Sequence, residues 1–392
     1  MKSERDTPVY RMARWFFKKI VVKYFRVEYI GLDSVKRLEK PYIVLPNHCS
    51  FFDPFLINAP IDEKFHYVVS DSSFRNPITR WLLAQTGAIA ITKNTTDLTS
   101  LKKMIEASRS GKVIGVFPEG LQNWDGATLP LIESTAKMVR MLNVPIVVPL
   151  IEGAYLMGPR WGTSFRRGRV FITYKILFDG IGPGEKKTSE IIQALKDALD
   201  HNEYKCERLK GIRFKGRKRA QNIEQLIYIC PQCHSISSFR SKGNDFSCQS
   251  CGYSVHYSET GHFIVKSGRA YFDNSVEWNR WQQQEASTIV KKDPGNEPLF
   301  SDDNLIYSTP DQKGTFRKRG RGSLYFYRDK LEFKDKNSQL SVYRFDSISG
   351  MNVQLHEKLE FYCKKELHRF FTVKKRFSAK KVYDFYKLCT SL

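Results

Sequence analysis

Short apolar runs alternate with longer stretches of helical periodicity between residue 40 and about residue 200. Such alternation is typical of an α/β sheet with helices on its faces, and ligands of such sheets collect in the loops beyond the strand ends. Strands are predicted at 42–46, 65–69, 87–92, 112–117, 145–151 and 168–176. Helices are predicted at 53–60, 76–85, 97–109, 131–142 and 187–201.

A histidine and an aspartate lie five residues apart after the first predicted strand, in the sequence Asn47-His48-Cys49-Ser50-Phe51-Phe52-Asp53. A carboxylate beside an imidazole fixes the tautomer of the ring, and the outer ring nitrogen can then remove a proton from a hydroxyl. The alternative is a nucleophilic pair of Cys49 and His48. Adjacent residues of an extended segment point to opposite faces, which is a poor geometry for that pair.

Three further blocks follow the histidine block in order. They are Gly87–Lys93, Phe117–Gly120 and Val144–Pro149, the last of which leads to Gly153. Together the four blocks resemble the glycerolipid acyltransferase family typified by 1-acylglycerol-3-phosphate acyltransferases, over about residues 10–200. The resemblance implies an acyltransferase-type sheet with flanking helices. It also implies transfer of an acyl group from a thioester, on coenzyme A or acyl carrier protein, to a hydroxyl of a lysophospholipid or related glycerolipid.

The resemblance assigns roles to residues in these blocks. His48 is the expected general base and Asp53 its orienting partner, so that the acceptor hydroxyl attacks the thioester without a covalent enzyme intermediate. The block Phe117, Pro118, Glu119 and Gly120 is expected to lie across the pocket and to help hold the phosphate end of the acceptor. Glu119 alternatively caps or pairs locally.

The chain departs from the family pattern at two places. Lys93 stands where the family usually has a phosphate-binding arginine, and a solvated lysine at a strand end is the alternative. After Gly120 the family usually continues with threonine and arginine, whereas this chain has Leu121 and Gln122. The change removes a bidentate phosphate contact. Candidate substitutes lie further along the chain, at Arg160, Arg166, Arg167 and Arg169.

The formal net charge of the chain is +23, which favours polyanionic partners such as anionic lipid headgroups, phosphorylated substrates or nucleic acid. We expect no transmembrane span and no signal peptide, since no apolar run approaches about 20 residues. The protein is therefore expected to be cytoplasmic and peripherally associated with the inner face of the membrane. Acyl carriers, a lipid acceptor and an anionic membrane surface are the expected partners, and nucleic acid is disfavoured.

Residues 1–26 are predicted to contain a basic amphipathic helix. Between residues 9 and 26, apolar and aromatic side chains recur at helical spacing, and six lysines and arginines crowd the other face. Cations opposite an aromatic face are typical of a helix that lies in the membrane interface. The alternative is a helix that packs on the protein's own core, and one helix can do both.

Four cysteines form the second specific signal. Cys230 and Cys233 are followed, after fourteen residues, by Cys248 and Cys251. Two thiolates on each of two tight turns complete a tetrahedron around Zn²⁺, and this spacing is that of a zinc ribbon. A closed site of four thiolates is structural. Disulfides are the alternative, which a cytoplasmic setting disfavours.

The remaining segments complete the predicted organisation. We expect an acyltransferase domain over 27–204, a basic linker over 205–222 and a zinc-ribbon domain over 223–290. From about residue 300 to 392 the pattern becomes alternating strands closed by a helix near 378–390, typical of an antiparallel β module of pleckstrin-homology (PH) or GRAM type. The rival hypothesis is a catalytically weak scaffold that binds membrane or nucleic acid through its ribbon and basic surface.

Overall fold

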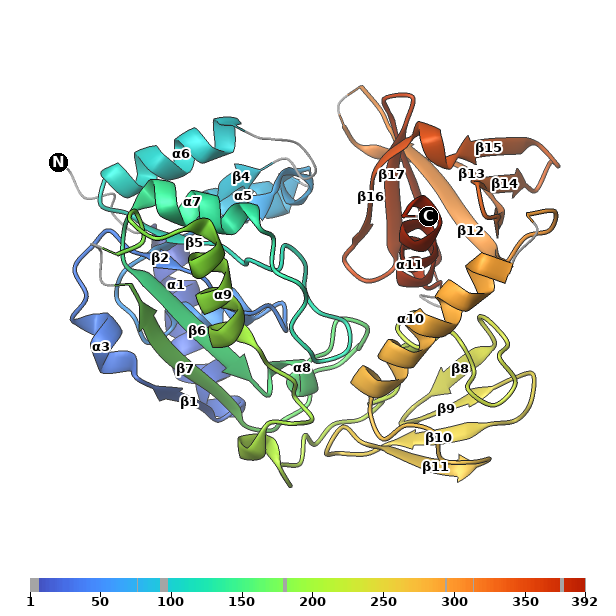
Figure 1. Ribbon diagram of the computed structural model, residues 1–392, viewed down its shortest axis with the longest axis horizontal. Helices are drawn as coiled ribbons and strands as arrows, with labels where there is room; N and C mark the ends of the chain where they lie inside the picture. The colour runs from blue at the N-terminus through green and yellow to red at the C-terminus, as the bar shows by residue number, and fades with distance from the viewer. Residues whose placement is uncertain are drawn as a thin grey trace. The chain divides into compact units, whose positions relative to one another are not determined.

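The computed structural model describes residues 7–75, 77–91, 98–178, 182–292, 295–312, 314–373 and 377–391 (Figure 1). Contacts within the chain divide it into two compact units. Unit 1 comprises Met1–Pro159 and Arg166–Lys215, and unit 2 comprises Arg160–Phe165 and Gly216–Leu392.

Unit 1 is built on a mixed seven-stranded sheet with the order β1-β7-β6-β2-β5-β3-β4. Its central strands β6, β2, β5 and β3 run parallel, and β7 runs antiparallel to β6. The strands are β1 (Val27–Ile30), β2 (Ile43–Val44), β3 (Phe65–Ser70), β4 (Ile89–Ile91), β5 (Val113–Gly115), β6 (Ile146–Glu152) and β7 (Val170–Leu177).

Helices cover both faces of this sheet (Figure 1). The α-helices are α1 (Pro8–Phe16), α2 (Val22–Tyr24), α3 (Leu32–Lys36), α4 (Asp53–Asn58), α5 (Pro77–Thr86), α6 (Leu98–Arg109), α7 (Ser134–Leu142), α8 (Ala154–Met157) and α9 (Thr188–Leu199). A π-helical turn, η1 (Phe17–Val21), joins α1 to α2, and two 3₁₀ turns are η2 (Asp71–Phe74) and η3 (Glu207–Leu209).

Alternate side chains of the central strands enter two separate cores, as the pleat of a strand requires. Ile43 and Ile146 face α6, α7 and α9, whereas Val44 and Val147 face α4, α8 and the N-terminal helical segment. The predicted α/β class is confirmed, and the strands buried on both faces are those whose sequence is continuously apolar. Three elements were not predicted, namely β1, α3 and α8. In β1 only alternate side chains are half-buried, so its apolar signal is short.

The predicted N-terminal helix is present and packs partly on unit 1. Val21 and Phe25 are buried, and Phe17 stacks on Phe55 of α4 with ring centroids 4.5 Å apart. The apolar side chains that stay exposed are Met12, Trp15, Phe16, Ile20 and Tyr24. None of the helices in the described ranges is long and apolar enough to cross a bilayer.

Unit 2 contains two antiparallel sheets, of order β11-β10-β9-β8 and β15-β14-β13-β12-β18-β17-β16 (Figure 1). The first sheet and its flanking elements are η4 (Ile223–Gln225), β8 (Phe239–Lys242), β9 (Asp245–Cys248), β10 (Ser254–Tyr257), β11 (Phe263–Ser267) and α10 (Ser275–Lys292). The second comprises β12 (Phe300–Pro310), β13 (Phe316–Phe326), β14 (Lys330–Asp335), β15 (Leu340–Arg344), η5 (Phe345–Ser347), β16 (Ile348–Gln354), β17 (Lys358–Cys363), β18 (Glu366–Phe371) and α11 (Ala379–Thr390).

Helices α10 and α11 hold unit 2 together. Trp278 of α10 is fully buried against Phe239 and Phe263 of the first sheet. The buried ammonium of Lys381 on α11 pairs with Asp302 of β12 at 2.7 Å. The predicted antiparallel strands and closing helix are confirmed, and their PH or GRAM likeness stays a prediction.

Part of the segment predicted as a basic linker, 205–222, is packed against unit 1. Leu209 and Phe214 are buried in one of the two cores of that unit. The lysines and arginines around them remain mostly exposed, so the charge run is the solvated side of a packed segment.

Candidate active site and cysteine cluster

The predicted catalytic residues lie along one edge of the sheet of unit 1, the edge formed by the carboxyl ends of its central strands. Strand β2 leads into the loop that carries His48, and β5 leads into the loop that carries Glu119. Since β2 pairs in parallel with both β5 and β6, the carboxyl ends of all three strands meet at this edge. The loops that follow these strands therefore converge here, which is where open α/β sheets bind their ligands.

His48 and Asp53 contact each other directly. The Nδ1 of His48 lies 2.9 Å from Oδ2 of Asp53, the first residue of α4. The same oxygen accepts the backbone N–H groups of Cys49 and Ser50 at 2.6 and 2.8 Å. Burial raises the pKa of Asp53, and these hydrogen bonds oppose the rise. With Nδ1 donating to Asp53, Nε2 carries the lone pair, and the ring is 22% exposed.

Glu119 is a buried bridge between two loops. Its Oε1 accepts the backbone N–H of His48 at 2.6 Å, and its Oε2 accepts that of Leu129 at 2.7 Å. Burial raises the pKa of Glu119 to about 8, while the two N–H groups act in the opposite direction. In this structure its carboxylate fixes the backbone beside the histidine.

The other residues of the FPEG block shape the same loop. The ring of Phe117 stacks on the imidazole of His48, with centroids 4.1 Å apart. Gly120 has φ of +68°, and a Cβ there would approach Cδ1 of Ile132 to 2.5 Å. The carbonyl of Pro118 accepts the N–H of Ile132 at 2.8 Å. The positive φ favours glycine at this turn, and a larger residue would also have to displace the end of the Ile132 side chain.

Three residues that were not predicted also hold the histidine loop, two through their amide side chains and one through its backbone. Asn47 is fully buried and exchanges hydrogen bonds with both the N–H and the C=O of Ile151 on β6, at 2.8 and 2.9 Å. Asn123 donates its backbone N–H to the carbonyl of His48 at 2.9 Å. Gln122 donates its side-chain Nε2–H to the carbonyl of Cys49 at 2.8 Å. In the sequence, only the position of these residues next to the predicted motifs indicates that they could belong to the site.

Cys49 is poorly placed to act as a nucleophile. Its side chain is fully buried. Burial, together with the nearby carboxylates of Asp53 and Glu203, raises the pKa of this thiol well above its usual range. A thiol that stays protonated and away from solvent does not attack a thioester.

The arginines considered as phosphate ligands are engaged elsewhere. Arg160 belongs to unit 2 and donates to the carbonyls of Val353 and Leu355. Arg166 is buried and donates to the carbonyl of Leu156. Arg167 lies over the ring of Tyr24, and Arg169 pairs with Glu28. Lys93 lies outside the described residues.

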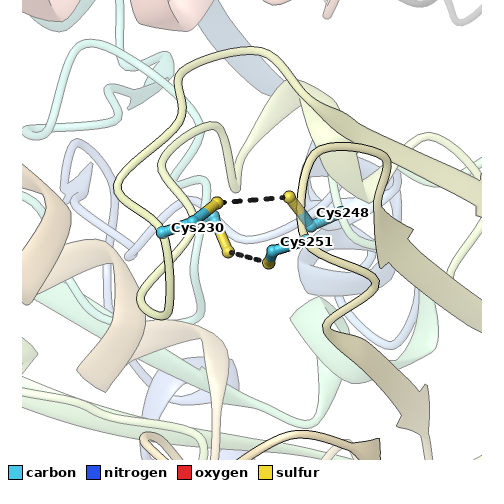
Figure 2. Close-up of side chains that lie close together, drawn as sticks. Cys230, Cys248 and Cys251 are labelled. Atoms are coloured by element: carbon cyan, nitrogen blue, oxygen red, sulfur yellow. Dashed lines mark hydrogen bonds between the residues drawn. The ribbon is translucent and has the colours of Figure 1, made fainter.

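The four predicted zinc ligands come together in unit 2. Figure 2 shows side chains of the two cysteine turns pointing toward one another. The sulfurs of Cys230 and Cys251 lie 3.7 Å apart, as do those of Cys233 and Cys248. Zn–S bonds of about 2.3 Å in a tetrahedron place sulfurs about 3.8 Å apart, whereas a disulfide needs about 2.05 Å. The geometry fits a metal site of four thiolates.

Comparison with known proteins finds a similar family for the first part of the chain. Residues 26–151 match the family model described as Acyltransferase, and the cysteine cluster and C-terminal sheet lie outside the matched region. The curated relatives below carry the name 1-acyl-sn-glycerol-3-phosphate acyltransferase, which agrees with the resemblance found in the sequence.

The curated relatives include a 1-acyl-sn-glycerol-3-phosphate acyltransferase of Chlamydomonas reinhardtii, 24% identical over 200 residues, which are 48% of this chain and 58% of the relative. That of Saccharomyces cerevisiae is 24% identical over 185 residues, 44% of this chain and 60% of the relative. The crystal structure of the 1-acyl-sn-glycerophosphate acyltransferase PlsC from Thermotoga maritima is 20% identical, with a TM-score of 0.41, and the match covers 54% of this chain and 84% of that one. This chain thus spans less than two thirds of its curated relatives.

The buried Glu119 generates a prediction about stability and pH. Its pKa is about 8 in the folded protein and near 4.5 in the unfolded chain, so between these values the folded state holds a proton that the unfolded state has lost. The free energy of unfolding should therefore fall as pH rises through this window, and Glu119→Gln should show a shallower slope. Denaturant unfolding at several pH values measures both slopes. The exposed Glu133→Gln is the matched control, and equal slopes in wild type and Glu119→Gln would contradict the prediction.

Proposed function

We propose that this protein transfers an acyl group from an acyl thioester, carried by coenzyme A or acyl carrier protein, to the hydroxyl of a lysophospholipid or related glycerolipid. The observation that carries the proposal is the hydrogen bond of 2.9 Å between His48 and Asp53, in a domain that matches the acyltransferase family model. The ring is partly exposed at the ligand-binding edge of the sheet, so a substrate hydroxyl can reach Nε2.

The proposed reaction needs one base and no covalent enzyme intermediate. Nε2 of His48 takes the proton of the acceptor hydroxyl while that oxygen attacks the thioester carbonyl. The imidazolium formed is stabilised by the Asp53 carboxylate. When the tetrahedral intermediate collapses, the carbon–sulfur bond breaks and the thiolate leaves. The proton held by His48 passes to that thiolate, which restores the neutral base. Lys93 and backbone N–H groups are the proposed donors to the oxyanion.

Removal of the base should abolish turnover without unfolding the protein. His48→Ala is expected to lower kcat by about 10²- to 10⁴-fold, since this is what a positioned general base contributes. Cys49→Ala should retain most of the activity, because its buried thiol takes no part in the proposed reaction. Acyl transfer is measured with acyl-CoA and acyl carrier protein donors and a panel of lysophospholipids.

His234→Ala changes an exposed histidine of unit 2 and is the matched control for this series. Normal turnover in His48→Ala would refute the assignment of the base, and loss of turnover in a folded Cys49→Ala would restore the nucleophile hypothesis. Absence of turnover in wild type with all donors and acceptors would favour the scaffold hypothesis. The replacement of the family arginine by Gln122, which bonds to the loop backbone, is the observation that supports that rival.

We also propose that unit 1 binds an anionic membrane surface through α1, η1 and α2. The exposed apolar side chains Met12, Trp15 and Ile20 lie on a segment that also exposes Lys18 and Lys19. Apolar groups enter the headgroup region while the cations meet anionic phosphates. Phe17 of the same segment packs on Phe52 and Phe55, so this surface adjoins the loop of the proposed base.

The triple substitution Met12→Ser, Trp15→Ser and Ile20→Ser should reduce binding to vesicles of phosphatidylglycerol and phosphatidylcholine by at least about tenfold. The reason is that burial of each such side chain contributes about 1.5–3 kcal/mol. The docked side chains Val21 and Phe25 are left intact, so the fold is kept. Co-sedimentation measures binding. Ile264→Ser, an equally exposed change in unit 2, is the control, and unchanged sedimentation of the triple variant would refute the proposal.

For the cysteine cluster of unit 2 we propose a structural Zn²⁺. Its four thiolates would hold the metal with no open position, so the ion would supply stability and no chemistry.

The second sheet with α11 is proposed as a docking module of PH or GRAM type. Its strand order, in which β12 pairs with β18, supports that likeness, and exposed Arg317, Lys318 and Arg321 on β13 suit anionic lipid.

Loss of one zinc ligand should unfold the ribbon part of unit 2. Cys248→Ser is expected to lower the zinc content and to expose the fully buried Trp278, because metal binding and folding are linked in small metal-stapled domains. Elemental analysis and near-ultraviolet circular dichroism measure the two effects. Cys363→Ser, a cysteine of the other sheet, is the control, and a Cys248→Ser protein with unchanged metal content and spectrum would contradict a structural zinc.

A further inference from the structure

A second cluster of metal-ligating side chains lies in unit 1. Glu152 ends β6, His201 follows α9 and Cys206 precedes the turn η3. One ligand atom from each of the three lies within 4.8 Å of the others. Glu152 and His201 are buried, and Cys206 is partly exposed, so an ion has a route from solvent to the cluster.

The histidine of this cluster has a carboxylate as its hydrogen-bond partner. Its Nε2 lies 3.2 Å from Oε2 of Glu203. The Glu203 carboxylate is itself fixed, because it accepts the N–H groups of Gly153 and Tyr155 at 2.7 and 2.9 Å. Nε2–H of His201 therefore donates, which leaves the lone pair on Nδ1. A carboxylate that binds the second ring nitrogen is the usual outer partner of a metal-ligating histidine.

The glutamate also has an outer partner. Nη1 of Arg208 lies 2.8 Å from Oε2 of Glu152, and the Cys206 sulfur lies 2.9 Å from Oε1. Ligating carboxylates are commonly hydrogen-bonded in this way. Oε1 faces the thiol and remains available to an ion.

Cys206 lies in a tight turn, in which the backbone N–H of Leu209 donates to the carbonyl of Cys206 at 3.0 Å. Burial and the hydrogen bond to Glu152 raise the pKa of the Cys206 thiol to about 12. An ion at this position therefore has to displace the proton of the thiol, because the thiolate is the form that binds a metal.

We propose that Glu152, His201 and Cys206 bind a single Zn²⁺-type cation, with solvent as the remaining ligand. Carboxylate, imidazole and thiolate are the ligand types that bind Zn²⁺ in proteins. On binding, the Cys206 thiol releases its proton to solvent and its hydrogen bond to Glu152 is replaced by two metal–ligand bonds. No electron is transferred.

The site would brace the strand that supports the histidine loop. Ile151, which precedes Glu152, is the residue that Asn47 holds on both its backbone groups. An ion at Glu152 would therefore fix the end of β6 next to the loop contact. The competing occupant is a proton on His201: burial lowers the pKa of this ring, but the hydrogen bond to Glu203 and the carboxylates of Glu203, Glu152 and Asp200 together outweigh burial and raise it.

Metal stoichiometry of the full-length protein separates the two occupants. Wild type, Cys206→Ser and His201→Gln are equilibrated with Zn²⁺, freed of unbound metal and analysed for bound zinc, with folding followed by circular dichroism. Each variant should bind one equivalent less than wild type and should unfold at a lower temperature in Zn²⁺. Cys389→Ser, a partly exposed cysteine outside both clusters, should match wild type.

A Co²⁺ titration gives a second readout. The sulfur-to-cobalt charge-transfer absorbance at saturation should be larger in wild type than in Cys206→Ser, because the variant keeps only the thiolates of the unit 2 cluster. Wild type and Cys206→Ser with equal zinc content, or with equal charge-transfer absorbance, would overturn the proposal and leave a proton on His201 as the occupant. The outcome does not depend on whether acyl transfer is observed.

Discussion

One carboxylate oxygen organises the candidate active site. Oδ2 of Asp53 accepts three N–H groups, from the ring of His48 and from the backbones of Cys49 and Ser50. These bonds fold the loop back on the start of α4. The spacing of five residues between His48 and Asp53 is the length of chain that this folded loop contains. Burial raises the pKa of Asp53, and the three donors act in the opposite direction by stabilising its carboxylate. The tautomer of the histidine and the path of its loop are thus set by the same atom.

The loop is then fixed from two further strands. Glu119, from the loop after β5, holds the N–H of His48, and Asn47 holds both backbone groups of Ile151 on β6. Burial, and after it the nearby carboxylates of Asp53 and Glu203, raise the pKa of the Cys49 thiol and keep it neutral. The thiol of Cys49 is therefore buried and protonated, whereas the neighbouring ring of His48 is hydrogen-bonded to Asp53 and partly exposed.

The sequence predicted the features that depend on local pattern. Strands buried on both faces were predicted from their continuous apolar runs, and the cysteine turns from their spacing. Contacts between distant segments had no such signal. Asn47 and Asn123 look like ordinary loop residues, and only the fold shows that one is fully buried and that the other binds the backbone of His48. The arginines after residue 159 illustrate the converse, because their charge suggested phosphate binding while their contacts place them in other interactions.

The altered FPEG loop bears on how an acceptor would be recognised. Gln122 stands where the family usually has an arginine that binds phosphate. Its side-chain N–H donates to the carbonyl of Cys49, so this side chain stabilises the loop instead. Phe51, 68% exposed beside His48, packs on Phe55, and Phe55 stacks on Phe17 of the basic N-terminal segment. On the proposed function, an amphiphilic acceptor held in the membrane interface would present its hydroxyl to the ring. Selection of the acceptor would then depend more on where the acceptor lies in the membrane interface than on a bidentate contact between an arginine and its phosphate. The enzyme should therefore accept acceptors with different headgroups.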